Sequence, residues 1–158
     1  KIINDTPIAK ITLDKFEILK DFSARSSIIP ELDTKFSNKI SIIKIHPGQD
    51  PGIIEYYQKE GYKGLVLETT GLGQVPSKES KHNWLEKIKK AIDERMLIVA
   101  TAQTIHGHLN PNVYSSGRDL QKTGIIFLKE TSETALIKLG WVLGHRQWNK
   151  KQKIKEDF

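Results

Sequence analysis

From residue 40 onwards, short apolar runs alternate with amphipathic stretches, and this alternation constrains the fold more than any other feature of the chain. Strands that alternate with helices are typical of βαβ units, in which successive strands run parallel. We therefore predict an α/β fold with a small four-stranded parallel sheet flanked by helices, doubly wound through right-handed crossovers. The four expected strands are the apolar runs 40–45, 65–67, 96–100 and 125–127.

Helices are expected between these runs, because apolar residues recur there at helical spacing. The clearest helix has one apolar face, made of Trp84, Leu85, Ile88, Ala91 and Ile92. On its outer face, Glu86 and Lys90 are spaced to form an ion pair. Other helices are expected after Asp50, which can cap one, over 117–123, and from Thr131 or Ser132 to Gly144.

The first 39 residues lack this alternation. Residues 8–11 and 16–19 are spaced to pair as a hairpin, and residues 21–39 are polar and irregular. A two-stranded hairpin is only marginally stable alone, so we expect it to pack on something else. The sequence thus predicts three parts: a hairpin and connector arm (1–39), an α/β domain (40–145) and a basic tail (146–158).

Composition narrows the class of protein. The chain has 158 residues and no cysteine, so no disulfide can form, and no apolar run approaches the roughly 20 residues that cross a bilayer. A cytoplasmic protein is therefore expected. The formal charge of +6 could suggest a polyanion partner, but only four residues are arginine and the lysine-rich tail carries part of the excess. A solvated lysine-rich surface is the favoured interpretation.

Ligands of a doubly wound sheet bind at the carboxyl ends of its strands, where loops 46–50, 68–76 and 101–114 are expected. Within them, 69–73 resembles a phosphate cradle because two glycines lie close together. The segment lacks the Lys-Ser/Thr of a P-loop and the spacing of a dinucleotide fingerprint. A tight turn is therefore the favoured interpretation.

Residues suited to metal binding or catalysis are present but do not form a recognisable set. His46, His82, His106 and His108 are candidate metal ligands, yet no cysteine, HExxH motif or carboxylate cluster accompanies them. The candidate nucleophiles, Thr70, Thr101 and Ser116, have no evident base with an orienting partner. We expect no metal and no cofactor, and the residues alone indicate a binding or interface domain.

Several ordered segments resemble one enzyme family. Residues 61–76 are similar to the "GYxGIVxExTGxGHVP" segment of bacterial-type L-asparaginases and of the D subunit of archaeal-type tRNA-dependent glutamyl amidotransferases. Segments 101–107, 110–120 and 133–145 follow in the family's order, and 3–9 resembles the point where its first domain hands over to its second. The form Asn-x-Asn-x-Tyr-x-x-Gly-Arg at 110–118 favours the D-subunit branch.

The resemblance implies a two-domain amidohydrolase in which this chain is the carboxy-terminal domain. The family's nucleophilic threonine, second threonine, Asp and Lys have no counterpart here, so no catalytic residue is expected in this chain. We expect a separate amino-terminal chain to supply them, in a dimer of heterodimers or larger assembly that hydrolyses asparagine or glutamine and releases ammonia. The alternatives are the ammonia-generating D subunit, with tRNA as a partner, and a non-catalytic interaction domain.

In this family the carboxy-terminal domain closes a neighbouring subunit's active site and contacts the substrate's α-amino and carboxylate groups. The resemblance therefore implies that Gln74, Gln103 and Tyr114 bind substrate. Gln74 stands where the family usually has His or Asn, which keeps a polar side chain but alters its reach. The other interpretation is that Gln103 and Tyr114 only tie the long loop together.

Overall fold

The computed structural model describes residues 6–156, and the chain divides into two compact units, Lys1–Thr34 and Lys35–Phe158. In the first unit, β1 (Ala9–Ile11) and β2 (Phe16–Ile18) form the antiparallel hairpin that the sequence predicts. Its turn is closed by a 2.8 Å hydrogen bond from the Thr12 N–H to the Lys15 carbonyl. Predictions for residues 1–5 and 157–158 lie outside the described residues.

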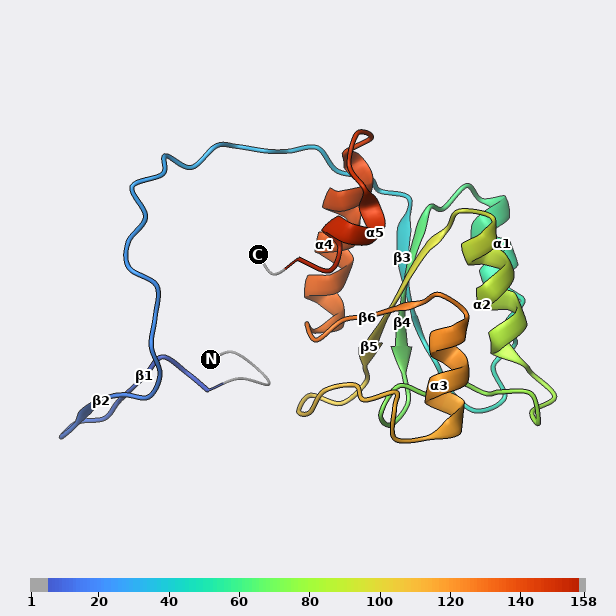
Figure 1. Cartoon of the computed structure of the whole chain (residues 1–158), viewed down its shortest axis with the longest axis horizontal. Helices are drawn as coiled ribbons and strands as arrows, with labels where there is room; N and C mark the ends of the chain where they lie inside the picture. Colours follow the sequence, from blue (N-terminus) through green and yellow to red (C-terminus); the bar gives the residue numbers. More distant parts are fainter. Residues whose placement is uncertain (1–5, 157–158) are drawn as a thin grey trace. The chain divides into compact units, whose positions relative to one another are not determined.

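The second unit contains a four-stranded parallel sheet, which confirms the predicted α/β fold (Figure 1). Its strands are β3 (Ile40–Lys44), β4 (Gly64–Thr69), β5 (Leu97–Ala102) and β6 (Ile126–Phe127), in that spatial order. Strand order therefore follows chain order. The doubly wound arrangement was wrong, because such a fold needs a reversal of strand order and these four strands show none.

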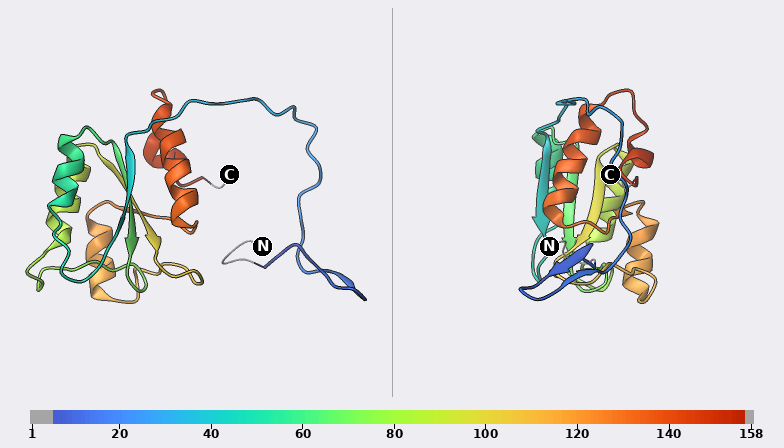
Figure 2. Two further views of the ribbon diagram at one scale, coloured as in Figure 1. Left: turned by 180° about the vertical axis from the view of Figure 1, so that it is seen from behind. Right: turned by 90° about the vertical axis from the view of Figure 1, so that its left-hand side faces the viewer.

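Helices cover both faces of the sheet (Figures 1 and 2). The crossover helices α1 (Ile53–Lys59), α2 (Trp84–Asp93) and α3 (Ser115–Lys122) lie on one face, because right-handed crossovers that advance in one direction stay on one side. After β6, α4 (Ser132–Gly144) returns over the opposite face with α5 (Lys150–Lys153). No helix within residues 6–156 has the length and apolar character needed to cross a bilayer.

Two hydrophobic clusters form the core, one on each face of the sheet. Along β4, Leu65 and Leu67 belong to the cluster beneath α1 and α2, and Val66 belongs to the cluster beneath α4. This follows from the strand's two-residue period, which sends alternate side chains to opposite faces. A sheet buried on both faces needs continuous apolar strands, as the sequence shows.

Of the two predicted helix caps, one agrees with the structure and one differs. Thr131 caps α4 through a bond from the Thr134 N–H, as expected, and Asn83 caps α2, for which no cap was predicted. Asp50 instead accepts a 2.8 Å bond from the Gly52 N–H, so a turn separates it from α1.

The predicted Glu86–Lys90 pair on α2 is also absent from the pairs formed by the described residues. Lys90 lies 3.8 Å from Glu55 on the neighbouring α1, and Glu86 accepts a bond from Asn83. Packing of α1 beside α2 thus redirects the lysine, which sequence spacing within one helix could not reveal.

The segment expected to be a basic tail is partly folded into the second unit. It contains α5, which Asn149 caps, and the Ile154 side chain is completely buried. Trp148 stacks on His145 with ring centroids 3.6 Å apart and planes 4° apart. Apolar burial therefore holds this segment against the domain, although lysines dominate its sequence.

Candidate functional site

The ends of β3, β4 and β5 are joined by one side chain at the carboxyl edge of the sheet. Gln103 follows β5, and its Nε2 donates to the Ile45 carbonyl at 2.5 Å and to the Glu68 carbonyl at 2.8 Å. Its backbone N–H also donates to the Thr69 carbonyl. Gln103 is therefore a structural tie for the loops at this edge, and both of its amide hydrogens are used inside the protein.

The glycine loop (residues 69–76) is a tight turn, as the sequence favoured. Thr70 and Gln74 exchange backbone hydrogen bonds of 3.1 and 2.9 Å, and the Gly73 N–H donates to the Thr70 carbonyl. Gly71 and Gly73 have positive φ angles of 52° and 109°, which side-chain-bearing residues rarely adopt. Because the loop's own carbonyls accept these N–H groups, they are not available to cradle a phosphate.

The other two predicted substrate contacts lie on different loops of the same edge. Gln74 is half-buried, with its Oε1 against Gly71, where a Cβ atom would approach it to 2.6 Å. Tyr114 occupies the N-cap position of α3 and is 54% exposed. The substrate contacts of Gln74, Gln103 and Tyr114 stay predictions, with Tyr114 the most accessible of the three.

Sequence reasoning missed an ion pair at this edge. Lys44 is the register partner of Glu68 at the end of the parallel β3–β4 ladder, and the Lys44 Nζ lies 3.9 Å from the Glu68 Oε2. The Glu68 side chain is only 18% exposed. The available signal was that both residues are the charged ends of apolar strands, which parallel pairing brings together.

Two of the three candidate nucleophiles, Thr70 and Thr101, use their hydroxyls within the scaffold. The Thr101 hydroxyl is buried and lies 2.8 Å from the Ser132 hydroxyl at the start of α4, and the Thr69 hydroxyl donates to the Thr101 carbonyl. The Thr70 hydroxyl donates to the Gln74 carbonyl, and Ser116 lies in the first turn of α3. Thr101 thus links β5 to α4.

The four candidate histidines lie in partly or fully exposed loops. The His46 Nδ1 is 3.0 Å from the Pro47 carbonyl oxygen, while His106 and His108 are exposed in the loop after β5. Between residues 6 and 156, the structure brings no three His, Asp or Glu side chains together in a way that could hold a metal ion.

Beyond β6, Glu130 forms a largely buried ion pair with Lys138 of α4. The Lys138 Nζ lies 2.5 Å from the Glu130 Oε1, and the lysine side chain is 6% exposed. Burial raises the pKa of Glu130, but the Lys138 hydrogen bond, backbone N–H donors and the lysine charge together lower it below its ordinary value of 4.5. The Glu130 carboxylate therefore stays ionised, and the Lys138 ammonium group balances its charge.

The carboxyl edge as a whole is a rigid base that carries polar groups. The Gln74 amide and the Tyr114 phenol lie on loops, and the Glu68 carboxylate lies near the end of β4, whose carbonyl Gln103 binds. Such an edge can bind polar groups of a small ligand or complete a site shared with other residues.

Comparison with known proteins gives a consistent result. Residues 39–158 match the model of the "Glutaminase/Asparaginase C-terminal domain" family. The chain is 42% identical over 146 residues to the D subunit of glutamyl-tRNA(Gln) amidotransferase from Thermococcus kodakarensis, covering 90% of this chain and 32% of the relative. It is 43% identical over 148 residues to the same subunit from Pyrococcus abyssi, covering 92% and 33%. The chain thus spans about a third of these relatives.

Solved L-asparaginases have the same fold. The thermostable L-asparaginase from Thermococcus kodakarensis superposes with a TM-score of 0.83 at 25% identity, covering 98% of this chain and 47% of that one. L-asparaginase I from Vibrio cholerae gives 0.80 at 22% identity, covering 99% and 47%. The second likeness concerns the fold alone.

Proposed function

Because the chain belongs to the glutaminase/asparaginase C-terminal domain family, we propose that it completes the amide-hydrolysing site of an amidotransferase of the D-subunit type. The observation that carries this proposal is the identity of 42–43% to two such subunits over nine-tenths of the chain, against 25% to an L-asparaginase. The reaction would hydrolyse the side-chain amide of glutamine or asparagine and release ammonia for transfer to an aminoacyl-tRNA. We propose that this reaction takes place in the cytoplasm.

In this proposal the chain binds and orients substrate, and catalysis comes from elsewhere. The Gln74 amide and the Tyr114 hydroxyl would contact polar groups of the amide substrate, and Gln103 would hold their loops in place. Fixing a small substrate against the nucleophile converts binding into rate, because the reacting atoms then need no further ordering.

The nucleophilic threonine would lie in the region that corresponds to the remaining two thirds of the relatives' length. There it would attack the amide carbon and form an acyl-enzyme that water hydrolyses. The relatives are named as one subunit of an amidotransferase, which supports a further subunit as a partner. We propose one such partner together with Glu-tRNA(Gln).

A chimera tests the proposal. Residues 39–158 replace the matching part of the Thermococcus kodakarensis amidotransferase relative, and ammonia release from glutamine is measured with its partner subunit, with and without Glu-tRNA(Gln). A second chimera carries the equivalent domain of the Thermococcus kodakarensis L-asparaginase as the matched control. We expect activity that depends on Glu-tRNA(Gln) from the first chimera and not from the second.

The second candidate function is that of a plain L-asparaginase, favoured by the TM-score of 0.83 to such an enzyme. In that case the first chimera would release ammonia from asparagine, and Glu-tRNA(Gln) would leave the rate unchanged. If a correctly folded chimera released no ammonia from either substrate, a non-catalytic interaction domain would be the better description.

A further inference from the structure

Strand β6 is the open edge of the sheet. Among residues 6–156 it pairs with β5 alone, where the Leu128 N–H donates to the Ala100 carbonyl at 2.9 Å. Backbone groups of successive strand residues point to opposite sides, so the N–H and carbonyl of Phe127 point away from β5. An edge of this kind offers hydrogen-bonding groups to a further strand.

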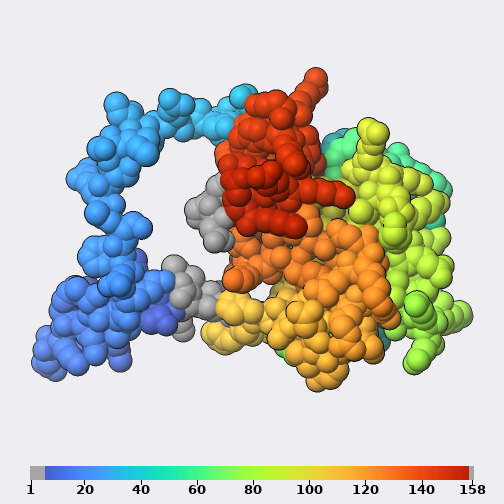
Figure 3. All heavy atoms as spheres, in the orientation of Figure 1, coloured from blue at the N-terminus to red at the C-terminus, as the bar shows by residue number. Residues whose placement is uncertain are grey.

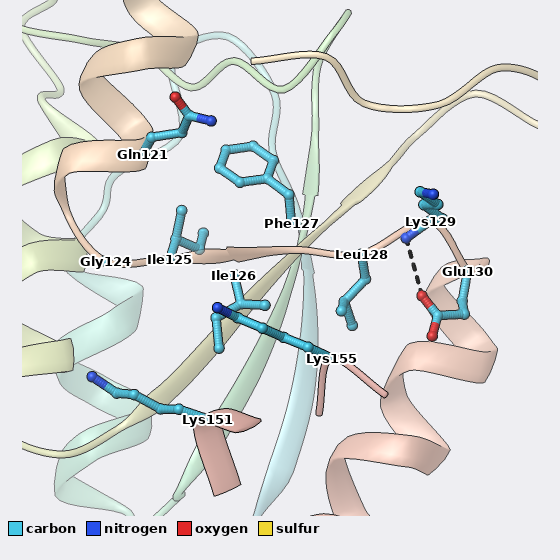
Figure 4. Close-up of a pocket in the computed structure, with 10 residues that line it drawn as sticks. All are labelled: Gln121, Gly124, Ile125, Ile126, Phe127, Leu128, Lys129, Glu130, Lys151 and Lys155. Atoms are coloured by element: carbon cyan, nitrogen blue, oxygen red, sulfur yellow. Dashed lines mark hydrogen bonds between the residues drawn. The ribbon is translucent and has the colours of Figure 1, made fainter. Parts of the chain in front are cut away.

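A groove of about 610 Å³ runs along this edge (Figure 4). We call it the β6 groove, and residues 124–130, which include β6, line it along its length. Gln121 of α3 and the half-buried Phe127 ring form one wall. Lys151 and Lys155 form the other, with their stems lying beside the strand. In Figure 3 the C-terminal segment (red) lies against this α3–β6 region (orange).

The β6 groove carries positive charge. Lys151 and Lys155 form no ion pair with any residue between 6 and 156, whereas the neighbouring Lys153 contacts Glu156 at 2.5 Å. The acidic residue of the groove is Glu130, whose charge is balanced by Lys138. Unpaired lysines beside an open edge therefore dominate the field that an incoming chain would meet.

The spacing of these lysines matches an extended chain. Lys151 lies in α5 and Lys155 in the turn that follows it, where residues four apart are about 6 Å apart along a helical axis. Residues two apart on a strand, which share one face, are about 6.6 Å apart. A strand laid along β6 can therefore direct alternate side chains toward Lys151 and Lys155 while its backbone bonds to Phe127.

We propose that the β6 groove binds an extended acidic peptide segment of a partner protein, which adds to the sheet as a fifth strand. Backbone bonds to Phe127 supply the pairing, and alternate Asp or Glu side chains contact Lys151 and Lys155. This interaction surface lies at the sheet edge beyond β6 and does not depend on the amide-hydrolysing role.

A short fluorescent peptide, Glu-Val-Glu-Val-Glu with blocked ends, tests the proposal by fluorescence anisotropy with the full chain. We expect saturable binding that weakens about tenfold in the double variant Lys151→Gln, Lys155→Gln, since two exposed charge pairs are lost. The matched control is Lys63→Gln, Lys81→Gln, which removes the same charge from exposed lysines away from the groove and should bind normally. A peptide N-methylated at alternate residues should not bind, because it cannot pair with Phe127.

Three results would overturn the proposal. Equal binding of the N-methylated peptide would show simple charge attraction without strand pairing. Tighter binding of a uridine decamer that depends on the same two lysines would make the groove an RNA surface. Concentration-dependent self-association that the double variant abolishes would identify a second copy of this chain as the occupant. Binding of the unmodified peptide with the expected variant pattern would support it.

Discussion

The Gln103 side chain reaches the carbonyl of Ile45, 58 residues earlier in the chain, through a 2.5 Å hydrogen bond. The same nitrogen donates to the Glu68 carbonyl, so one amide group joins the ends of two neighbouring strands to the loop after a third. A role in positioning this edge follows directly. Substrate contact by Gln103, if it occurs, must use the side-chain oxygen.

Replacement of this side chain should loosen the edge. Gln103→Ala removes the side-chain donor from the Ile45 and Glu68 carbonyls, although the Glu68 carbonyl keeps the Ile45 N–H, and should lower the free energy of unfolding by about 1–3 kcal/mol in urea titrations. Gln147→Ala is the control, since Gln147 is exposed and should change stability by less than about 0.5 kcal/mol. Equal stability of the two variants would contradict the tie.

Gln74 should behave in the opposite way. Its backbone forms the bridge with Thr70, and alanine keeps that bridge. Gln74→Ala should therefore raise KM for the amide substrate in the assembled enzyme or chimera, while stability changes by less than about 0.5 kcal/mol. Unchanged kinetics would remove Gln74 from the substrate contacts. Gly71→Ala, in contrast, would strain the same loop. Its Cβ would meet the Gln74 Oε1, and its φ of 52° is one that residues with side chains rarely adopt.

The sequence predicted the layers of the fold well because they depend on local periodicity. Continuous apolar runs such as Met96–Ala100 indicated strands buried on both faces, and Thr131 caps its helix as expected. The failures involve contacts between elements. Lys90 pairs with Glu55 and not with the predicted Glu86, because α1 packs beside α2. Residue spacing within a single helix does not show such a neighbour.

The site was predictable only in outline for the same reason. Loops at one sheet edge follow from parallel pairing, so Gln74, Gln103 and Tyr114 could be assigned to that edge. The use of the Gln103 amide by Ile45 and Glu68 depends on loop geometry, and the Lys44–Glu68 pair depends on strand register. Both depend on tertiary packing, about which composition and motif spacing give no information.

The Glu130–Lys138 pair should make stability depend on pH. Removing one partner of a buried ion pair is strongly destabilising, so Glu130→Gln should lower the free energy of unfolding by about 3 kcal/mol at pH 7. The folded-state pKa of Glu130 is lowered, so its contribution is complete above the ordinary value of 4.5 and is lost as pH falls through the folded pKa.

Urea titrations of wild type and Glu130→Gln between pH 7 and pH 3 measure this contribution. Their difference should be constant above about pH 5 and shrink below 4.5. Glu133→Gln, an exposed residue of α4, is the control and should cost less than about 0.5 kcal/mol. A difference that stays constant to pH 3 would show that the pair's charge does not stabilise the fold.

The C-terminal segment should contribute to the stability of the domain through one side chain. Ile154 is completely buried in the cluster beneath α4, next to the lysines of α5. Ile154→Ala removes buried methyl groups and leaves a cavity, which should lower the free energy of unfolding by about 2–4 kcal/mol. Ile137→Ala is the matched control, because that side chain of α4 is 62% exposed and should change stability little.

Equal small effects of both variants in urea titrations would mean that residues 146–156 are dispensable to the core. A large effect confined to Ile154 would mean that the segment carrying Lys151 and Lys155 is held in place by apolar packing, as the β6 groove requires.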